Sequence, residues 1–166
     1  LSSRLNARIS KQDLLLLAGH LPESFKEAYP FHPLTIRAGT EGNFKRMYLS
    51  RFNIDLPGAF TLDGKGECHH LTDSLNRNIQ MDLDLQTYNL NFLTALGGTA
   101  PSPDLVIPDS MRLTTTLALD ASRLSALLNL NEQEGHIGLN ALYDMASQAY
   151  SANLYIEQLQ LHHFMP

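Results

Sequence analysis

The chain has a single cysteine and no long apolar run, and both scarcities exclude classes of protein. Because Cys68 is the only cysteine among 166 residues, the chain can hold neither an internal disulfide nor a cysteine-based zinc site. No run approaches the roughly 18 apolar residues that a membrane-spanning helix requires, and no signal peptide is recognisable. The chain begins at Leu1 and ends at Pro166 after an apolar stretch, so we expect an internal fragment of a longer protein.

Charged residues are few and unevenly distributed along the chain. The net charge is −5, but residues 1–51 carry +4 and the remaining 115 residues carry −9. A nucleic-acid-binding module is usually basic overall, with aromatic and basic side chains interleaved on one surface, and we therefore expect no nucleic-acid partner. With 43% apolar residues the chain can bury a core, and nothing in its composition indicates disorder.

Alternation of apolar and polar residues predicts a mainly β chain. It suits antiparallel strands with one apolar and one wet face. Glycine-containing stretches predict tight turns at 39–43, 57–58 and 63–66. The predicted strands cover residues 34–38, 52–56, 60–62, 81–85, 111–119, 137–143 and 152–156.

Three short helices are predicted beside these strands. Ser10 and Asp13 form a capping-box pattern ahead of a run of leucines that ends at position 17. A second helix is expected over 23–29, before Pro30, and a third over 89–96, before a glycine pair.

Alignment of three segments of the sequence with one another predicts an internal repeat. Residues 5–17, 81–93 and 152–164 have apolar residues at the same four positions, and Leu34 and Met111 begin a series of apolar pairs at a constant offset of 77. Chance coincidence of apolar residues is the alternative.

The repeat divides the chain into about two units of about 75 residues each. Residues 1–96 form the first repeat with a preceding strand–helix end, 97–109 form a proline-rich loop, and 110–166 form the second repeat. Because such a unit cannot bury its apolar face alone, we expect an elongated, curved, trough-like antiparallel sheet with short helices.

Six short motifs spread along the chain carry a resemblance to a known family. They are Ile9–Leu14, Leu21–Phe25, Asn43–Arg46, Leu56–Gly58, Asn89–Leu93 and Leu159–Pro166. These motifs resemble those of the TamB (translocation and assembly module) proteins of Bacteroides-type bacteria, which belong to the wider AsmA-like group.

The resemblance implies a long periplasmic protein, anchored in the inner membrane by a helix that lies outside this fragment. Such proteins consist of repeated β-sheet that curls into a trough with an apolar inner surface. The family functions in outer-membrane biogenesis: it assembles outer-membrane proteins with a barrel-type assembly partner and moves phospholipid between membranes. No catalytic residue is carried over, so we expect no enzymatic activity and no cofactor.

An apolar face of the sheet is the candidate functional site, with phospholipid acyl chains or outer-membrane protein segments as the expected partners. The alternative is a face closed over as ordinary core, in a structural spacer or protein-interaction module. The candidate residues of the open face are Ile36, Ile54, Phe60, Leu62, Leu83, Leu85, Leu117, Leu119, Leu139, Leu154 and Ile156.

Four further patterns are weak candidates for chemistry. The doublets His69-His70 and His162-His163 predict no metal site, because adjacent residues on a strand point to opposite faces. Residues 64–66 lack the pattern of a phosphate-binding loop and predict a hairpin. Asp82 and Asp84 are expected on one solvated face, about 7 Å apart. Cys68 beside a histidine does not indicate a nucleophile, since such dyads are assembled from residues distant in sequence.

Overall fold

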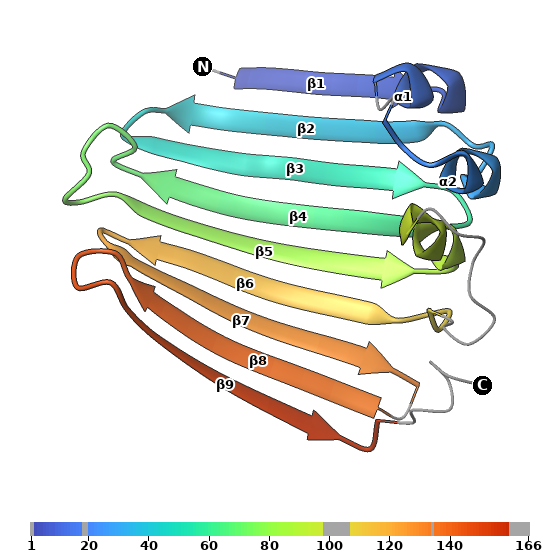
Figure 1. Cartoon of the computed structure of the whole chain (residues 1–166). Helices are drawn as coiled ribbons and strands as arrows, with labels where there is room; N and C mark the ends of the chain where they lie inside the picture. Colours follow the sequence, from blue (N-terminus) through green and yellow to red (C-terminus); the bar gives the residue numbers. More distant parts are fainter. Residues whose placement is uncertain (1, 18–19, 98–106, 134, 160–166) are drawn as a thin grey trace.

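Nine antiparallel strands form one open sheet in which each strand pairs with its neighbours in the chain (Figure 1). The structure is a computed structural model, and it describes residues 2–17, 20–97, 107–133 and 135–159. The strands are β1 (Ser2–Ile9), β2 (Leu34–Asn43), β3 (Arg46–Leu56), β4 (Phe60–His69), β5 (Asn78–Thr87), β6 (Arg112–Asp120), β7 (Arg123–Glu132), β8 (Gly135–Asp144) and β9 (Ala149–Glu157).

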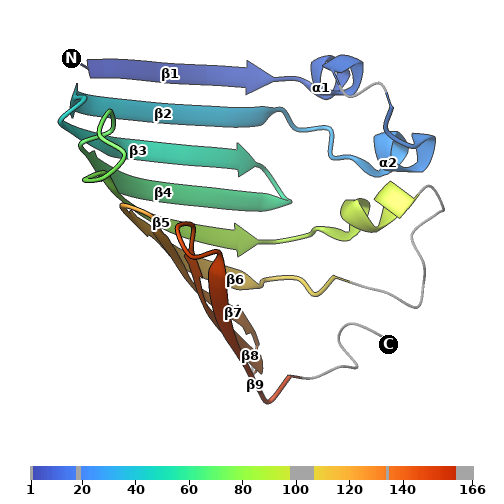
Figure 2. The ribbon, with the colours of Figure 1, turned by 60° about the vertical axis from the view of Figure 1, so that its left-hand side comes forward.

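This arrangement confirms the prediction of a mainly β chain with short helices. Because every connection joins adjacent strands, β1 and β9 are the two edges of the sheet. Figure 2 shows that the strands from β6 onward turn out of the plane of β1–β4. Right-handed twist between neighbouring strands accumulates in this way over a wide sheet.

Two of the predicted turns are wrong, because the glycines in them belong to strands. Gly39 lies inside β2, and Gly64 and Gly66 lie inside β4. A Cβ atom added to Gly64 would come within 2.8 Å of the Leu83 side chain, and one added to Gly66 within 2.6 Å of the Gln80 carbonyl oxygen. These glycines therefore make room for neighbouring strands, which is a recognised role of glycine within a sheet.

The turn predicted at Pro57-Gly58 is confirmed between β3 and β4. Gly58 has a φ of 79°, in the left-handed region where glycine has no steric penalty. β7 was not predicted, and β1 was expected only as part of the strand–helix end that precedes the first repeat. The alternating apolar residues of β7 are interrupted by Leu127, which makes the segment apolar on both faces.

The three short helices all lie at one end of the sheet (Figures 1 and 2). They are α1 (Lys11–Leu17), α2 (Glu23–Ala28) and η1 (Asn91–Gly97), a 3₁₀ helix. The predicted cap of α1 is present, because the backbone N–H of Asp13 donates to Ser10 Oγ at 3.2 Å. No helix in the described part of the chain is long and apolar enough to cross a membrane.

The buried core lies under these helices, at one end of the strands. Phe25 and Tyr29 contribute from α2 and its C-terminal end, and Phe92 from η1, with ring centroids 5.5–5.8 Å apart. The rings pack over Leu56 and Ala59 at the β3–β4 turn. Aromatic pairs at such distances stabilise a core by about 0.5–1.5 kcal/mol beyond the area that they bury.

Several predicted features stay predictions. Most of the loop 97–109 and the third copy of the helix in the repeat, within 160–166, lie outside the described residues. The repeat itself and the trough shape also stay predictions. The offset of 77 does relate Leu34, the first residue of β2, to Met111, the residue directly before β6.

Candidate functional site

A row of apolar residues crosses the sheet on one of its faces. Residues that pair directly on adjacent antiparallel strands point to the same face. Each member of this row pairs with the next. From β2 to β9 the row is Ile36, Ile54, Leu62, Leu85, Leu113, Leu130, Ile137 and Ile156. We call the face that carries this row the apolar face.

All eleven predicted residues lie on the apolar face. Five of them are members of the row, and the others lie an even number of positions from a row member on their own strand, which keeps them on the same face. Leu83, for example, is two residues from Leu85, and Leu139 pairs with Leu154 one row further along. The strand register therefore brings together residues that the sequence spreads over 121 positions.

Apart from the short helices at one end of the strands, no described element forms a layer over the apolar face. None of the eleven residues is buried: nine are half-buried by their neighbours on the sheet, and two are exposed. Those two are Leu154, at 62% exposure, and Ile156, at 54%, both on the edge strand β9. A face packed against a second layer would instead be buried along its length.

Phe60 differs from the other ten residues. It packs against the core cluster under the helices, together with Leu34 and Leu90. The helices therefore close the apolar face at one end of the strands (Figure 2), and no other helix of the described residues lies over it.

The opposite face, which we call the polar face, carries hydrogen-bonded side chains between neighbouring strands. Asn53 Nδ2 donates to Asp63 Oδ1 at 3.0 Å, and Thr116 Oγ1 donates to Asp82 Oδ1 at 2.9 Å. Cross-strand pairs of this kind stabilise a sheet. Their polar side chains make this the face that water contacts.

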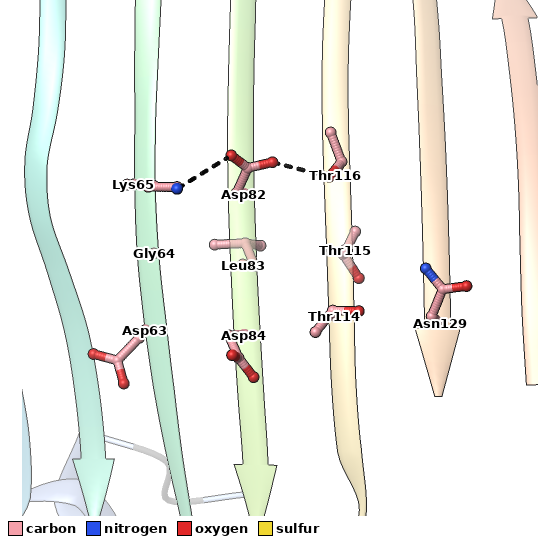
Figure 3. A pocket seen from close by; sticks show the side chains of 10 residues that line it. All are labelled: Asp63, Gly64, Lys65, Asp82, Leu83, Asp84, Thr114, Thr115, Thr116 and Asn129. Carbon is pink, nitrogen blue, oxygen red and sulfur yellow. Dashed lines mark hydrogen bonds and ion pairs between the residues drawn. The ribbon is translucent and has the colours of Figure 1, made fainter. Parts of the chain in front are cut away.

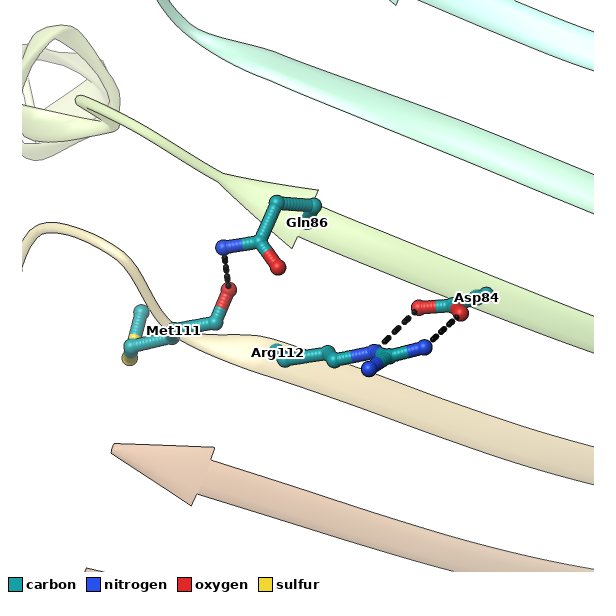
Figure 4. Close-up of polar contacts among 4 residues, drawn as sticks. All are labelled: Asp84, Gln86, Met111 and Arg112. Carbon is teal, nitrogen blue, oxygen red and sulfur yellow. Dashed lines mark hydrogen bonds and ion pairs between the residues drawn. The ribbon is translucent and has the colours of Figure 1, made fainter. Parts of the chain in front are cut away.

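The best-formed ion pair of the polar face joins β5 to β6. Arg112 approaches Asp84 with two guanidinium nitrogens, and its Nε–Oδ1 distance is 3.0 Å (Figure 4). Beside it, Gln86 Nε2 donates to the Met111 carbonyl oxygen at 3.3 Å. The hydrogen bond from Arg112 holds the pKa of Asp84 below its ordinary value, against the opposing effect of partial desolvation.

A depression of about 350 Å³ lies on the polar face over the middle of β4–β7 (Figure 3). Asp82 and Asp84 both line it, as the alternation predicts, and their side chains are 41% and 40% exposed. Lys65 Nζ lies 4.0 Å from Asp82, so each carboxylate has a cation beside it. A carboxylate held ionised in this way, as Asp84 is, makes a weak general base at neutral pH.

The histidine doublet that the structure describes is not arranged as a ligand pair. His69 ends β4, and its Nε2 lies 3.4 Å from a Glu67 carboxylate oxygen. His70 has already left the strand, with a φ of 53°. Among the described residues no group of three or more His, Cys, Asp or Glu side chains is placed to hold a metal ion. The second doublet, His162-His163, lies outside the described residues.

Cys68 lies on the apolar face, where it pairs with Met47 and Ile79. Burial, followed by the negative charge of Glu67, raises the pKa of its thiol. The neighbouring histidine therefore does not activate this cysteine as a thiolate nucleophile.

Sequence reasoning missed part of the apolar face. Leu128 and Leu130 on β7 fill the gap between the predicted residues of β6 and those of β8. The signal was present, since Leu128 and Leu130 alternate with asparagines, but Leu127, directly before Leu128, conceals it. Phe52 and Met81 extend the face on β3 and β5 in the same way.

Comparisons with family models, with curated proteins and with solved structures find no match to this chain. The case for a function therefore depends on the geometry of the sheet and on the resemblance of the short motifs.

Proposed function

We propose that this chain is a non-enzymatic segment of a cell-envelope protein whose apolar face guides phospholipid acyl chains or segments of nascent outer-membrane proteins. In the proposal, the sheet belongs to a longer trough in the periplasm, and the complete protein is anchored in the inner membrane. A barrel-type outer-membrane assembly protein is the expected partner of the complete protein. The motif resemblance supports this setting, and the uncovered apolar face supports the activity.

The uncovered face is the single observation that carries the proposal. Soluble proteins rarely expose contiguous apolar patches above a few hundred Å², and larger patches mark binding surfaces. Seven strand spacings of about 4.8 Å, from β2 to β9, make the face roughly 34 Å across, and three rows of side chains give it a height of about 14 Å. A projected area of about 500 Å² is in the range of the largest apolar patch on a monomer, and such patches are often functional.

The dimensions of the face suit a fatty acyl chain. One leaflet of a bilayer core is about 15 Å thick, so an acyl chain of that length fits across several strands. Each methylene transferred from water onto an apolar surface contributes about 0.8 kcal/mol. The polar face, with its paired Asp84 and Arg112, stays in water.

Photo-crosslinking at neighbouring residues tests the proposal. A photoreactive side chain at Leu83 or Leu119 is expected to crosslink to phospholipid in the complete protein. The matched control is Ala118, which is adjacent to Leu119 and points to the polar face. Absence of lipid adducts at Leu83 and Leu119, or equal labelling at Ala118, would contradict an open acyl-chain groove.

A second candidate function is that of a spacer or protein-interaction module that offers a strand edge to a partner. One observation favours it: all nine residues of β9 are exposed. β9 also lacks the lysines, prolines and bulges that usually protect an edge strand, and its one charged residue is Glu157 at its end. An extended segment of a partner could add to the sheet there.

Two substitutions in the complete protein separate these functions. Leu85→Asp places a charge in the middle of the apolar face and is expected to abolish lipid crosslinking while the chain still folds. Asn153→Pro disturbs the edge strand β9 and leaves the middle of the face intact. If Leu85→Asp abolishes the activity of the complete protein in outer-membrane biogenesis and Asn153→Pro does not, the result supports the groove. The opposite result supports the strand-edge module.

A further inference from the structure

Three arginines surround a depression on the polar face near the β1 edge. Arg4 lies on β1, Arg37 on β2 and Arg51 on β3, and all three are exposed. Arg4 pairs with Gly39, and Gly39 pairs with Arg51, so the glycine lies between the two arginines in one row. Arg37 is two residues from Gly39 on the same strand and therefore points to the same face.

Gly39 forms the floor of this depression, whose volume is about 470 Å³. Two strand spacings, about 10 Å, separate the stems of Arg4 and Arg51, and Arg37 is about 7 Å along the strand. A Cβ atom added to Gly39 would come within 3.2 Å of Ser50 Oγ, so the glycine leaves room for the side chains of β3 beside it. A β-bulge begins at Gly39, and Ser50 Oγ donates to its carbonyl oxygen at 3.1 Å. Bulges commonly redirect side chains beside binding sites.

The three guanidinium groups have no carboxylate partner within the part of the chain that the structure describes. Like charges this close on a sheet repel one another, and Glu41, at the rim, is the one acidic residue that lines the depression. Within the described residues, Arg8, Lys11, Lys45, Arg46 and Arg77 also have no carboxylate partner, whereas the four other cations are paired with carboxylates. Those pairs are Lys26 with Glu23, Lys65 with Asp82, Arg112 with Asp84, and Arg123 with Asp144.

We propose that Arg4, Arg37 and Arg51 bind a phosphate group over Gly39. A phosphate ester presents several oxygen acceptors, and the planar guanidinium fork matches their spacing with paired hydrogen bonds. Three positive charges against one negative charge at the rim leave the depression net cationic, which suits a phosphate anion. The site lies on the face opposite the apolar one, and so it does not depend on the function proposed for that face.

Two sources of phosphate are chemically equivalent at this site: a soluble phosphate ester and the headgroup of an anionic lipid. Titration of the folded chain with inorganic phosphate tests the shared chemistry. Saturable shifts are expected in the NMR amide signals of Gly39 and its neighbours. Arg37→Gln and Arg51→Gln should each weaken binding about three- to fivefold, as for exposed charge pairs. Glu41→Gln should tighten it, and Arg123→Gln, a matched loss of charge on the same face, should leave it unchanged.

Vesicle sedimentation distinguishes the two sources. Vesicles of phosphatidylcholine doped with phosphatidic acid are expected to retain the chain more strongly than pure phosphatidylcholine if the headgroup is the ligand. That difference should disappear in the Arg37→Gln/Arg51→Gln double variant. Phosphate binding without vesicle binding supports the site with a soluble ester as its ligand. The proposal is overturned if neither probe binds, or if Arg123→Gln weakens binding as much as the two site variants do.

Discussion

The substitution Leu56→Ala tests where the folding free energy of this chain is located. Leu56 is 1% exposed and lies under the aromatic cluster of the helical end. Leu154 lies on the same face of the sheet but is 62% exposed. The same substitution at Leu154 is therefore a matched control, because it removes the same atoms from an uncovered position.

The expected magnitudes follow from these two environments. A fully buried leucine replaced by alanine costs about 2–5 kcal/mol, since the lost transfer energy is joined by the cost of a cavity. We expect about 3 kcal/mol for Leu56, whose surroundings are held by three aromatic rings. Leu154 already contacts water and leaves no closed cavity, so its truncation should cost less than about 1 kcal/mol.

Thermal and urea unfolding, followed by circular dichroism, measure both values. For a domain of this size, 3 kcal/mol corresponds to a decrease in Tm of roughly 6–12 °C. The Leu154 variant should unfold within about 4 °C of the parent chain. An equal loss of stability in both variants would refute the reasoning, because it would mean that the apolar face at β9 is covered in solution.

Three further predictions concern single side chains. Gly66→Ala should destabilise the fold by about 1–3 kcal/mol in urea unfolding, because the new methyl group would overlap a backbone carbonyl of β5. Arg112→Gln should raise the pKa of Asp84 toward its ordinary value, as read from an NMR pH titration. Since the folded pKa of Asp84 is below the unfolded one, its contribution to stability is present above the unfolded pKa and is lost as the pH falls through the folded pKa. The Cys68 thiol should react with an alkylating reagent more slowly in the folded chain than in the unfolded one, and Glu67→Gln should accelerate the folded reaction.

Each of these predictions has a contradicting outcome. Unchanged stability of Gly66→Ala would show that β4 and β5 can separate without cost. An Asp84 titration unaffected by Arg112→Gln would remove the ion pair as the cause of the lowered pKa. Equal alkylation rates for Cys68 in folded and unfolded chains would show that its thiol is not shielded on the sheet.

The strands were predictable where one face is apolar and the other polar. In β5, Met81, Leu83 and Leu85 alternate with acids, and the strand that forms is the predicted one extended by a few residues at each end. The cap of α1 was predictable for a similarly local reason, because Ser10 bonds a backbone group only three residues away. Local patterns of this kind depend on period and spacing, which are properties of the sequence.

The glycines and β7 were not predictable from local patterns. Gly64 and Gly66 look like turn residues in the sequence, but the structure uses them where side chains of β3 and β5 approach β4. β7 has leucines on both faces, and only its pairing with β6 and β8 shows which of them belong to the apolar face. Both errors come from contacts between segments distant in sequence.

The arginine depression illustrates the same limit at a site. The sequence shows an excess of positive charge in residues 1–51, but it does not show which of those charges lie together. Arg4 and Arg51 are 47 positions apart. They meet across Gly39 because β1, β2 and β3 pair in one particular register.

The sequence by itself determined the class of this fold and placed the eleven predicted residues on one face of their strands. Alternation with a period of two sets the face of each side chain along its own strand. Only the tertiary structure decided that the strands pair in chain order, so that apolar residues of eight strands form one continuous row from β2 to β9. It also decided that the helices pack at one end, so that within the described residues most of the apolar face has no helix over it. Periodicity carries no information about what lies above a face, because covered and open faces have the same alternation.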